Sequence, residues 1–440
     1  MGRKSESKEI KDYEKYKVLL PRYIDVLKRL TNKYPITNNP TFAELVNFKK
    51  NKKEPIHRWF DYKQGYSSLL IEKILDVEKP EKELYLLDPF TGVGTTNLAG
   101  QKKGYKTIGL DINPVATFAA KVKTNIYTER DIEEIKSLIE NFKPTVSFEI
   151  PNSPLLERSF SKRSFNQLMK IKGFFESIQN EKLSSFFKLA YLAIIEDCSN
   201  RIKDGNGIKI ARNKNEILDV KEYFLSKVKS MLFDLIKNRY KCKSIVINGS
   251  LLEDKILKEI NNKKVGIVIF SPPYANCFDY CEVYKLELWM GGFVKNYADF
   301  RKYRDIAIRS HVNSKFDHTI RNENGNVNVI SDLISCFIVW NKNIPDMIRG
   351  YFDDMQDILQ RLRKLMANGS PCFIVVGNSG YRGVLVPTDL LISEIAEKLG
   401  FKVDDIIYAR KIRASSQQMK DLHGEYQNLM RESIVKMVKE

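Results

Sequence analysis

The sequence predicts an α/β fold built on a doubly wound, Rossmann-like sheet, and three successive segments support this prediction. LYLLDPF (84–90) is a short apolar run typical of a buried strand, and TGVGTTNLAGQKKG (91–104) is a glycine turn that enters a helix. TIGLDINP (107–114) is a second strand that ends on an acidic residue. A strand, turn, helix and strand in this order begin a sheet with helices on both faces.

The other elements follow from the spacing of apolar residues. A helix is expected within 9–31, a second near 67–75, and another within 282–290. Later strands and helices bring the sheet to about six or seven strands; the strands are 243–250, 264–274, 372–378 and 401–412, and the helices are 351–366 and 388–399.

Two long stretches interrupt this pattern, and both exceed an ordinary connection of about 4–6 residues. Residues 125–240 are basic and mostly helical, with a turn at 204–209, whereas the stretch after residue 292 is irregular. The predicted organisation is an N-terminal helical segment (1–56), a catalytic domain (57–124, 243–292 and 346–415), a helical insertion (125–242) and a second insertion (293–345) as the candidate for target recognition.

Composition favours a globular protein that binds a polyanion. Of 440 residues, 43% are hydrophobic and 29% are charged, which is not the balance of a disordered chain. Lys and Arg number 73 against 55 Asp and Glu, a net charge of +18, which suits nucleic acid as well as a generally Lys-rich proteome.

Cysteine spacing and hydropathy exclude two other classes of protein. The six cysteines form no CxxC pair and only four histidines are present, so we expect no metal site and reduced thiols. The first residues are charged throughout and the apolar runs are strand-sized, so we expect a cytoplasmic protein without a membrane partner.

The glycine turn is a candidate ligand site. Gly92 and Gly94 can adopt positive φ and allow a ligand close to the backbone, and the following helix directs free N–H groups at it. Asp111 ends the next strand, where a carboxylate can accept hydrogen bonds from both hydroxyls of a ribose. The turn lacks the third glycine of a dinucleotide fingerprint and the GK[ST] of a phosphate loop, so neither NAD nor ATP is favoured.

The second candidate is Ser271-Pro272-Pro273-Tyr274, directly after the apolar run VGIVIF. An exocyclic amine of a base is a poor nucleophile because its lone pair is delocalised into the ring. The Ser271 hydroxyl and the Pro272 carbonyl can accept both N–H bonds and direct the lone pair, while the prolines stiffen the segment. The Tyr274 ring offers a stacking face for a base outside the duplex. An isolated tetrapeptide of this kind is also compatible with a rigid turn or an exposed binding motif.

The combination of DPFTGVGTT with a later SPPY resembles the S-adenosylmethionine-dependent DNA amino-methyltransferases of bacterial restriction-modification systems. The resemblance implies a methyltransferase sheet with helical insertions that form a DNA-recognition lobe, and direct methyl transfer to a flipped base. Serine at the first position is similar to the cytosine-N4 branch, whereas adenine-N6 enzymes more often carry Asn or Asp. The order of the motifs differs from that of many cytosine-N4 enzymes, in which SPPY comes first.

The resemblance also implies roles for individual residues. HRWFDYKQGYS (57–67) is similar to the segment that covers the methionine end of the cofactor, and NGSL (248–251) to the strand end at its adenine, although the family usually has Asp where Ser250 stands. The implied catalytic residues are those of the tetrapeptide. The implied cofactor residues are Trp59, Tyr62, Asp88, Phe90, Gly92, Gly94, Thr95, Asp111 on the ribose, Ile112 on the adenine, and Ser250.

Double-stranded DNA is the implied partner, together with a cognate restriction endonuclease. Segments 158–172 and 296–318 mix basic and aromatic residues, and segment 409–419 combines basic residues with glutamines; these compositions suit phosphate and base-edge contacts. Adenine-N6 methylation, methylation of an RNA base, and a non-catalytic DNA-binding protein stay open as alternatives. The candidate DNA-binding residues are Arg301, Arg304, Arg309 and Arg413.

Overall fold

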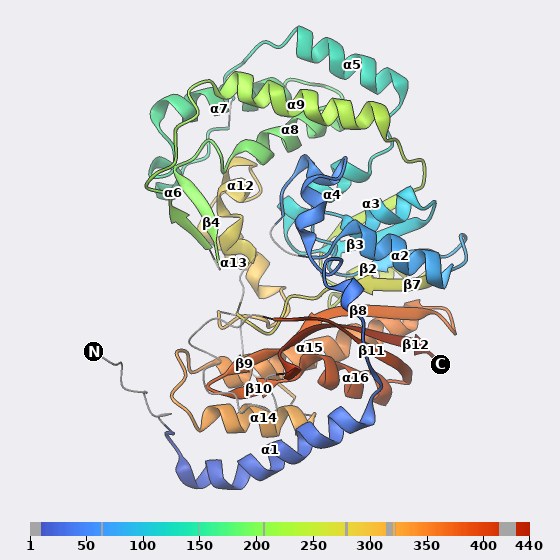
Figure 1. The fold of residues 1–440 in the computed structure, drawn as a ribbon. Helices are drawn as coiled ribbons and strands as arrows, with labels where there is room; N and C mark the ends of the chain where they lie inside the picture. The colour runs from blue at the N-terminus through green and yellow to red at the C-terminus, as the bar shows by residue number, and fades with distance from the viewer. Residues whose placement is uncertain are drawn as a thin grey trace. The chain divides into compact units, whose positions relative to one another are not determined.

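A computed structural model describes residues 10–62, 65–147, 149–205, 207–277, 280–313, 320–321, 323–412 and 428–440 (Figure 1). The chain divides into two compact units. Unit 1 comprises Met1–Val46, Leu251–Phe278 and Asp305–Glu440, and unit 2 comprises Asn47–Ser250 and Asp279–Arg304.

Unit 2 contains the strand–turn–helix–strand run that the sequence predicts. β2 (Tyr85–Asp88), β3 (Lys106–Asp111) and β6 (Ser244–Asn248) are parallel, in the order β2-β3-β6. The glycine turn leads from β2 into α3 (Thr95–Lys102), and β3 leads into α4 (Pro114–Thr124). α2 (Ser68–Glu78) packs on α3, while α3 and α4 both pack on β3. The α/β prediction is confirmed here.

The long basic stretch of unit 2 is largely helical, as predicted. α7, α8 and α9 pack on one another through a cluster of aromatic rings, and α8 also packs on α4 (Figure 1). The turn expected at 204–209 proves to be a hairpin of β4 (Arg201–Asp204) and β5 (Gly207–Ile210). The helices are α5 (Glu129–Glu140), α6 (Pro154–Glu157), α7 (Lys162–Glu176), α8 (Glu181–Ile194), α9 (Val220–Lys237), α11 (Tyr280–Val283), α12 (Lys285–Met290) and α13 (Tyr297–Asp305).

The sheet of unit 1 has the strand order β1-β11-β12-β8-β7 in the described residues, with β1 parallel to β11 and β7 parallel to β8. β12 runs antiparallel to both of its neighbours, β11 and β8. Apolar spacing in the sequence predicts a sheet that ends at 401–412 and does not predict β12, which follows a stretch without regular apolar spacing. The strands are β1 (Ile36–Asn38), β7 (Val265–Phe270), β8 (Pro371–Gly377), β11 (Phe401–Lys411) and β12 (Arg431–Lys439).

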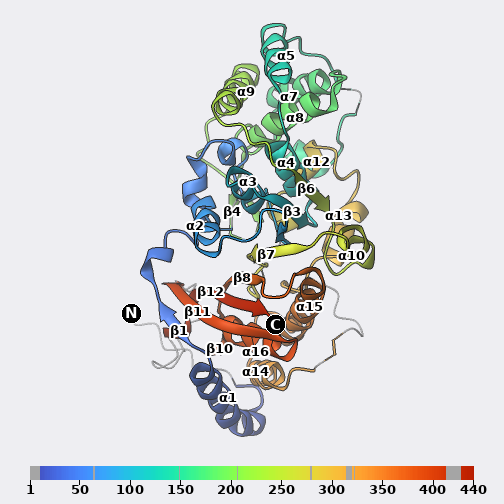
Figure 2. The same ribbon diagram turned by 90° about the vertical axis from the view of Figure 1, so that its right-hand side faces the viewer.

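Helices pack on this sheet and on one another. α16 (Thr388–Lys398) packs on β8, β11 and β12, and α1 (Tyr13–Lys33) packs on α14 (Gly325–Ser335) and α16. Figure 2 shows α1 and α14 side by side. Unit 1 also contains α10 (Asp254–Ile260), α15 (Ile344–Leu365), and a hairpin of β9 (Ser379–Tyr381) and β10 (Val384–Val386).

The expectation that 293–345 is irregular is wrong for α13 and α14. α14 begins where the Asn324 side chain accepts hydrogen bonds from the backbone N–H groups of Asn326 and Val327, and apolar side chains then recur toward the core.

All six cysteines are free thiols. Among the helices that the structure describes, none combines the length and apolarity needed to cross a membrane.

Candidate active site

The glycine turn of unit 2 has a backbone that larger residues would not tolerate. Gly92 and Gly94 have φ of 52° and 83°, and Gly94 is the N-cap of α3. A Cβ on Gly94 would lie 2.9 Å from the Cβ of Ala120, so both the conformation and the space require glycine. The turn therefore brings backbone N–H groups to the start of α3 without a side chain in front of them.

Asp111 is tied to this turn at the carboxyl end of β3. Its two oxygens accept hydrogen bonds from the backbone N–H groups of Gly92 (2.9 Å) and Asn113 (2.8 Å). Burial raises the pKa of Asp111 to about 6, and these N–H donors oppose the rise. The residue is half-buried, so its carboxylate can also accept hydrogen bonds from ligand hydroxyls.

The end of β6 lies against the same corner. The Asn248 amide donates to the carbonyl oxygens of Asp111 and Ile112, both at 3.0 Å, and the N–H of Gly249 donates to the Asp111 carbonyl at 2.9 Å. Ile112 is half-buried and Ser250 is buried. The structure thus brings Asp111, Ile112 and the NGSL segment together, as the sequence analysis expects; their contact with an adenine stays a prediction.

Asp88 is buried beneath the turn. One oxygen accepts from the Phe90 N–H (2.9 Å), and the other accepts from the hydroxyls of Tyr66 (3.0 Å) and Thr96 (2.6 Å). Burial raises the pKa of Asp88 to about 7, against the effect of these donors. The carboxyl group therefore joins the ends of the turn. Tyr66 and Thr96 are not among the site residues predicted from the sequence, although Thr96 belongs to the motif itself.

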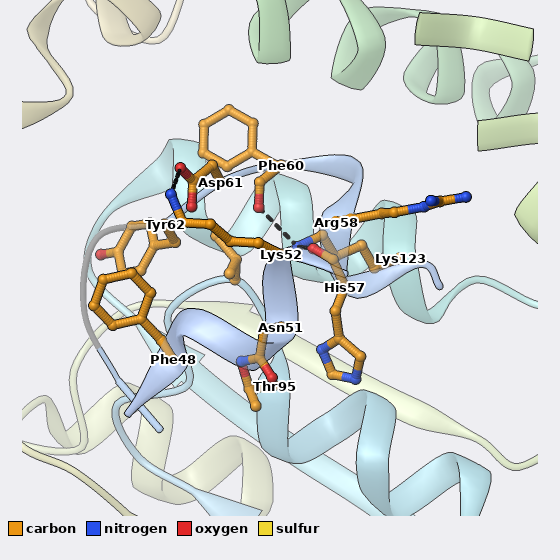
Figure 3. A pocket seen from close by; sticks show the side chains of 11 residues that line it. Phe48, Asn51, Lys52, His57, Arg58, Phe60, Asp61, Tyr62, Thr95 and Lys123 are labelled. Atoms are coloured by element: carbon orange, nitrogen blue, oxygen red, sulfur yellow. Dashed lines mark hydrogen bonds and ion pairs between the residues drawn. The ribbon is translucent and has the colours of Figure 1, made fainter. Parts of the chain in front are cut away.

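Segment 48–62 and the glycine turn line one cavity of about 130 Å³ (Figure 3). Figure 3 shows the Phe48 and Tyr62 rings on one side of it, and Asn51 close to Thr95 at the start of α3. Tyr62 and Thr95, predicted from distant motifs, are thereby brought to the same site. The lining residues are Phe48, Asn51, Lys52, His57, Arg58, Phe60, Asp61, Tyr62, Val93, Thr95 and Lys123.

Lys123 of α4 holds this segment in place and was missed by the sequence analysis. Its buried ammonium donates to the carbonyl oxygens of His57 (2.9 Å) and Phe60 (3.3 Å), as Figure 3 shows. Burial, together with repulsion from Lys227, lowers the pKa of Lys123 to about 7. Nothing in the local sequence distinguishes Lys123 from the other lysines of the chain.

Trp59 lies elsewhere. Its side chain is 1% exposed, donates to the Asp234 carboxylate at 3.2 Å and packs edge-on against Phe186 of α8. Among the described residues that line the cavity, Trp59 does not occur. Trp59 therefore joins the segment to the helical part of unit 2, and direct cofactor contact by this residue stays a prediction.

The Ser-Pro-Pro-Tyr segment follows the fully buried β7 in unit 1. Ser271, Pro273 and Tyr274 are half-buried and Pro272 is buried. The Tyr274 hydroxyl donates to Glu432 Oε1 of β12 at 2.6 Å, and Arg410 Nε of β11 donates to Glu432 Oε2 at 2.5 Å. The ring of Tyr274 is thus fixed by an ion pair on two strands.

Two close contacts restrict the same segment further. A Cβ on Gly377 of β8 would lie 2.7 Å from Tyr274 Cε2, so glycine leaves room for the ring. The Tyr381 hydroxyl donates to the Ala275 carbonyl at 2.7 Å, directly after the tetrapeptide. The segment is therefore a rigid platform that leaves Ser271 partly exposed.

The four predicted DNA-binding arginines differ in their surroundings. Arg301 is exposed on α13, whereas Arg304 is paired with Glu282. Arg309 is paired with Asp354 at 2.6 Å and its side chain is 11% exposed. Arg413 lies outside the described residues. Of the three that are described, Arg301 has the guanidinium most accessible to phosphate.

The chain is similar to three type II methyltransferases along most of its length. It is 29% identical to "Type II methyltransferase M.AvaI" of Nostoc sp. (strain PCC 7120 / SAG 25.82 / UTEX 2576) over 420 residues, 87% of this chain and 86% of that protein. It is 27% identical to M.BsoBI of Geobacillus stearothermophilus (87% and 85% covered) and 24% identical to M.MvaI of Kocuria varians (82% and 85%). No protein-family model matches.

One solved structure, titled a TehB-like SAM-dependent methyltransferase from Corynebacterium glutamicum, matches at 10% identity with a TM-score of 0.28, over 86% of this chain and 90% of that chain. The α/β assignment rests instead on the strands and helices described above. The chain is a homologue of type II methyltransferases.

Proposed function

We propose that this protein is an S-adenosylmethionine-dependent DNA methyltransferase that methylates the exocyclic N4 amine of cytosine in double-stranded DNA, as the modification enzyme of a restriction-modification system. The observation that carries this proposal is the Ser-Pro-Pro-Tyr segment at the carboxyl end of β7, with the Tyr274 ring held by Glu432 and Ser271 left accessible. The similarity to type II methyltransferases supports it.

The residues around the glycine turn fit the cofactor. Gly92 and Gly94 place no side chain between the backbone of the turn and a ligand, and Asp111 is an acceptor suited to ribose hydroxyls. Ile112 would pack on the adenine, near the buried Ser250. Phe90, Thr95 and the cavity beside Tyr62 would receive the methionine end, while Asp88 would hold the turn. When bound, the cofactor supplies an electrophilic methyl group.

The tetrapeptide supplies the groups that activate the amine. Ser271 Oγ and the Pro272 carbonyl would accept its two N–H bonds, and this favours a pyramidal nitrogen whose lone pair is free to react. Tyr274 would stack on the flipped base, and Pro273 stiffens the segment. The amine nitrogen would take the methyl group as the bond between that methyl and the sulfonium sulfur breaks, which would leave S-adenosylhomocysteine, and would then release a proton. No covalent intermediate with the protein is required.

Double-stranded DNA would be held by basic side chains, of which Arg301 is the best placed. The excess of positive charge suits that partner because cations that neutralise phosphates release condensed counterions. A restriction endonuclease that cuts the same sequence would be the functional partner.

The test is to express the chain in a bacterial host that lacks DNA methylation and to analyse digested nucleosides by mass spectrometry. We expect N4-methylcytosine, confined to one short motif in single-molecule sequencing, and far less of it with Ser271→Ala. N6-methyladenine would overturn the assignment to cytosine but keep the reaction. Unmodified DNA from a host that contains folded protein would overturn the proposal.

A further inference from the structure

Unit 2 contains a buried cluster of charges that is connected to the glycine turn through two aromatic side chains. Lys203, on the hairpin strand β4, forms ion pairs with Glu287 of α12 and, at 3.0 Å, with Glu196. The side chains of Lys203 and Glu287 are 7% and 2% exposed. Charges buried to this extent are costly unless they are paired, so the position of the Lys203 ammonium is closely determined.

The Lys203 ammonium also contacts an aromatic pair. It lies 4.6 Å from the ring centroid of Tyr284, a residue only 1% exposed between α11 and α12. Tyr284 stacks on Tyr62, with centroids 4.8 Å apart and an angle of 10° between the rings. A cation over a buried ring is an attractive contact, and it restrains the ring in its plane.

Tyr62 in turn covers the turn itself. Its Cε1 lies 3.2 Å from the point that a Cβ of Gly92 would occupy, and Tyr62 lines the cavity beside Thr95. An unbroken series of contacts therefore leads from Lys203 through Tyr284 and Tyr62 to Gly92. The hairpin of β4 and β5 is thereby connected to the turn by side-chain contacts.

We propose that Lys203 is a positioning residue for cofactor binding: it holds Tyr284, and through Tyr284 it holds the Tyr62 ring against the glycine turn. This inference rests on the proposed function, because the turn is the proposed cofactor site. Lys203 itself touches no cofactor; it reduces the freedom of the ring that does. Preorganised rings bind more tightly because less conformational entropy is lost on binding.

The test is isothermal titration of the full-length protein with S-adenosylhomocysteine. Lys203→Met alone leaves the buried Glu287 carboxylate without its ion pair, so the double variant Lys203→Met/Glu287→Gln and the separate variant Tyr284→Leu are used as well. We expect each to bind about tenfold more weakly, with Lys203→Arg close to the unmodified protein. Lys182→Met is the matched control, because Lys182 also pairs with a carboxylate (Asp131) and lies over a tyrosine (Tyr127) in unit 2. The control should bind normally.

A double-mutant cycle separates positioning from general stability. In a Tyr62→Leu background, Lys203→Met/Glu287→Gln should weaken binding no further, because the ring it positions is gone. An undiminished loss in that background, or unchanged affinity of the folded double variant, would overturn the inference alone. Absence of binding by the unmodified chain would overturn the proposed function and this inference with it.

Discussion

The glycine turn and the Ser-Pro-Pro-Tyr segment each follow a buried strand, yet they are held in different ways. The turn is held mainly by residues of its own neighbourhood, since Asp88 bonds to Phe90 and Thr96, and Gly92 bonds to Asp111. Tyr274 is held by Glu432, which is 158 residues away in the sequence. The turn is held by residues that are near it in the sequence, whereas the tetrapeptide is held by residues that only the tertiary structure brings close.

The loss of a contact should have a different consequence in each region. Loss of a turn contact should change ligand affinity first, because the backbone N–H groups and carboxylates of the turn form the proposed cofactor site. Loss of a contact around the tetrapeptide should change turnover, since that segment is proposed to act on the amine. A variant that changes ligand affinity but not turnover therefore points to the turn, and a variant that changes turnover but not ligand affinity points to the tetrapeptide.

The largest effect is expected for Ser271→Ala. Removal of one positioned hydrogen-bonding group in a catalytic site lowers kcat by about a hundredfold or more. We expect such a loss in the transfer of tritiated methyl groups to unmethylated genomic DNA, with an unchanged Kd for S-adenosylhomocysteine. Normal turnover would remove Ser271 from the catalytic residues, and a weakened Kd would show that the two regions are not separable.

Asp111→Ala should show the opposite pattern. A hydrogen bond to a charged group contributes about 1.5–3 kcal/mol, so the Kd for S-adenosylhomocysteine should rise by roughly ten- to a hundredfold. Titration calorimetry measures this directly. With saturating cofactor, kcat should be largely retained; unaltered affinity would contradict the proposed ribose contact.

Tyr274→Phe keeps the ring but removes the hydroxyl that Glu432 holds. We expect kcat to fall about tenfold, in line with the loss of one hydrogen bond to a carboxylate. If Glu432 acts through that hydroxyl, adding Glu432→Gln to Tyr274→Phe should cost little more. Glu394→Gln, at another buried glutamate of unit 1, is the control and should turn over normally. Additive losses would refute the coupling.

The smallest effect concerns pH. Because burial raises the pKa of Asp111 to about 6, the free site is protonated below that pH, whereas hydroxyl donors favour the ionised carboxylate. Affinity for S-adenosylhomocysteine should therefore rise about fivefold from pH 5 to pH 7 and then level off. In Asp111→Ala, the part of the rise in affinity that depends on this carboxylate should be absent. An identical pH profile in that variant would assign the rise in affinity to another titratable group.

Much of the glycine turn was predictable from the sequence. Gly92, Gly94 and Asp111 are close in the chain, and their spacing after a strand is itself the structural requirement. The tetrapeptide was equally predictable, because the apolar run VGIVIF before it is typical of a buried strand. Its supports were not, since Glu432 and Arg410 lie on β12 and β11, and β12 was not predicted as a strand.

The sequence by itself determined the α/β class, the strand–turn–helix–strand run and the two motifs, because each depends on residues a few positions apart. Tertiary structure alone decided that Lys123 holds segment 57–60, that Trp59 packs against α8, and that Arg309 is paired with Asp354. It also decided that Lys203 contacts the Tyr284 ring, on which Tyr62 stacks. These contacts join residues far apart in the chain, and local propensity carries no information about which distant side chains meet.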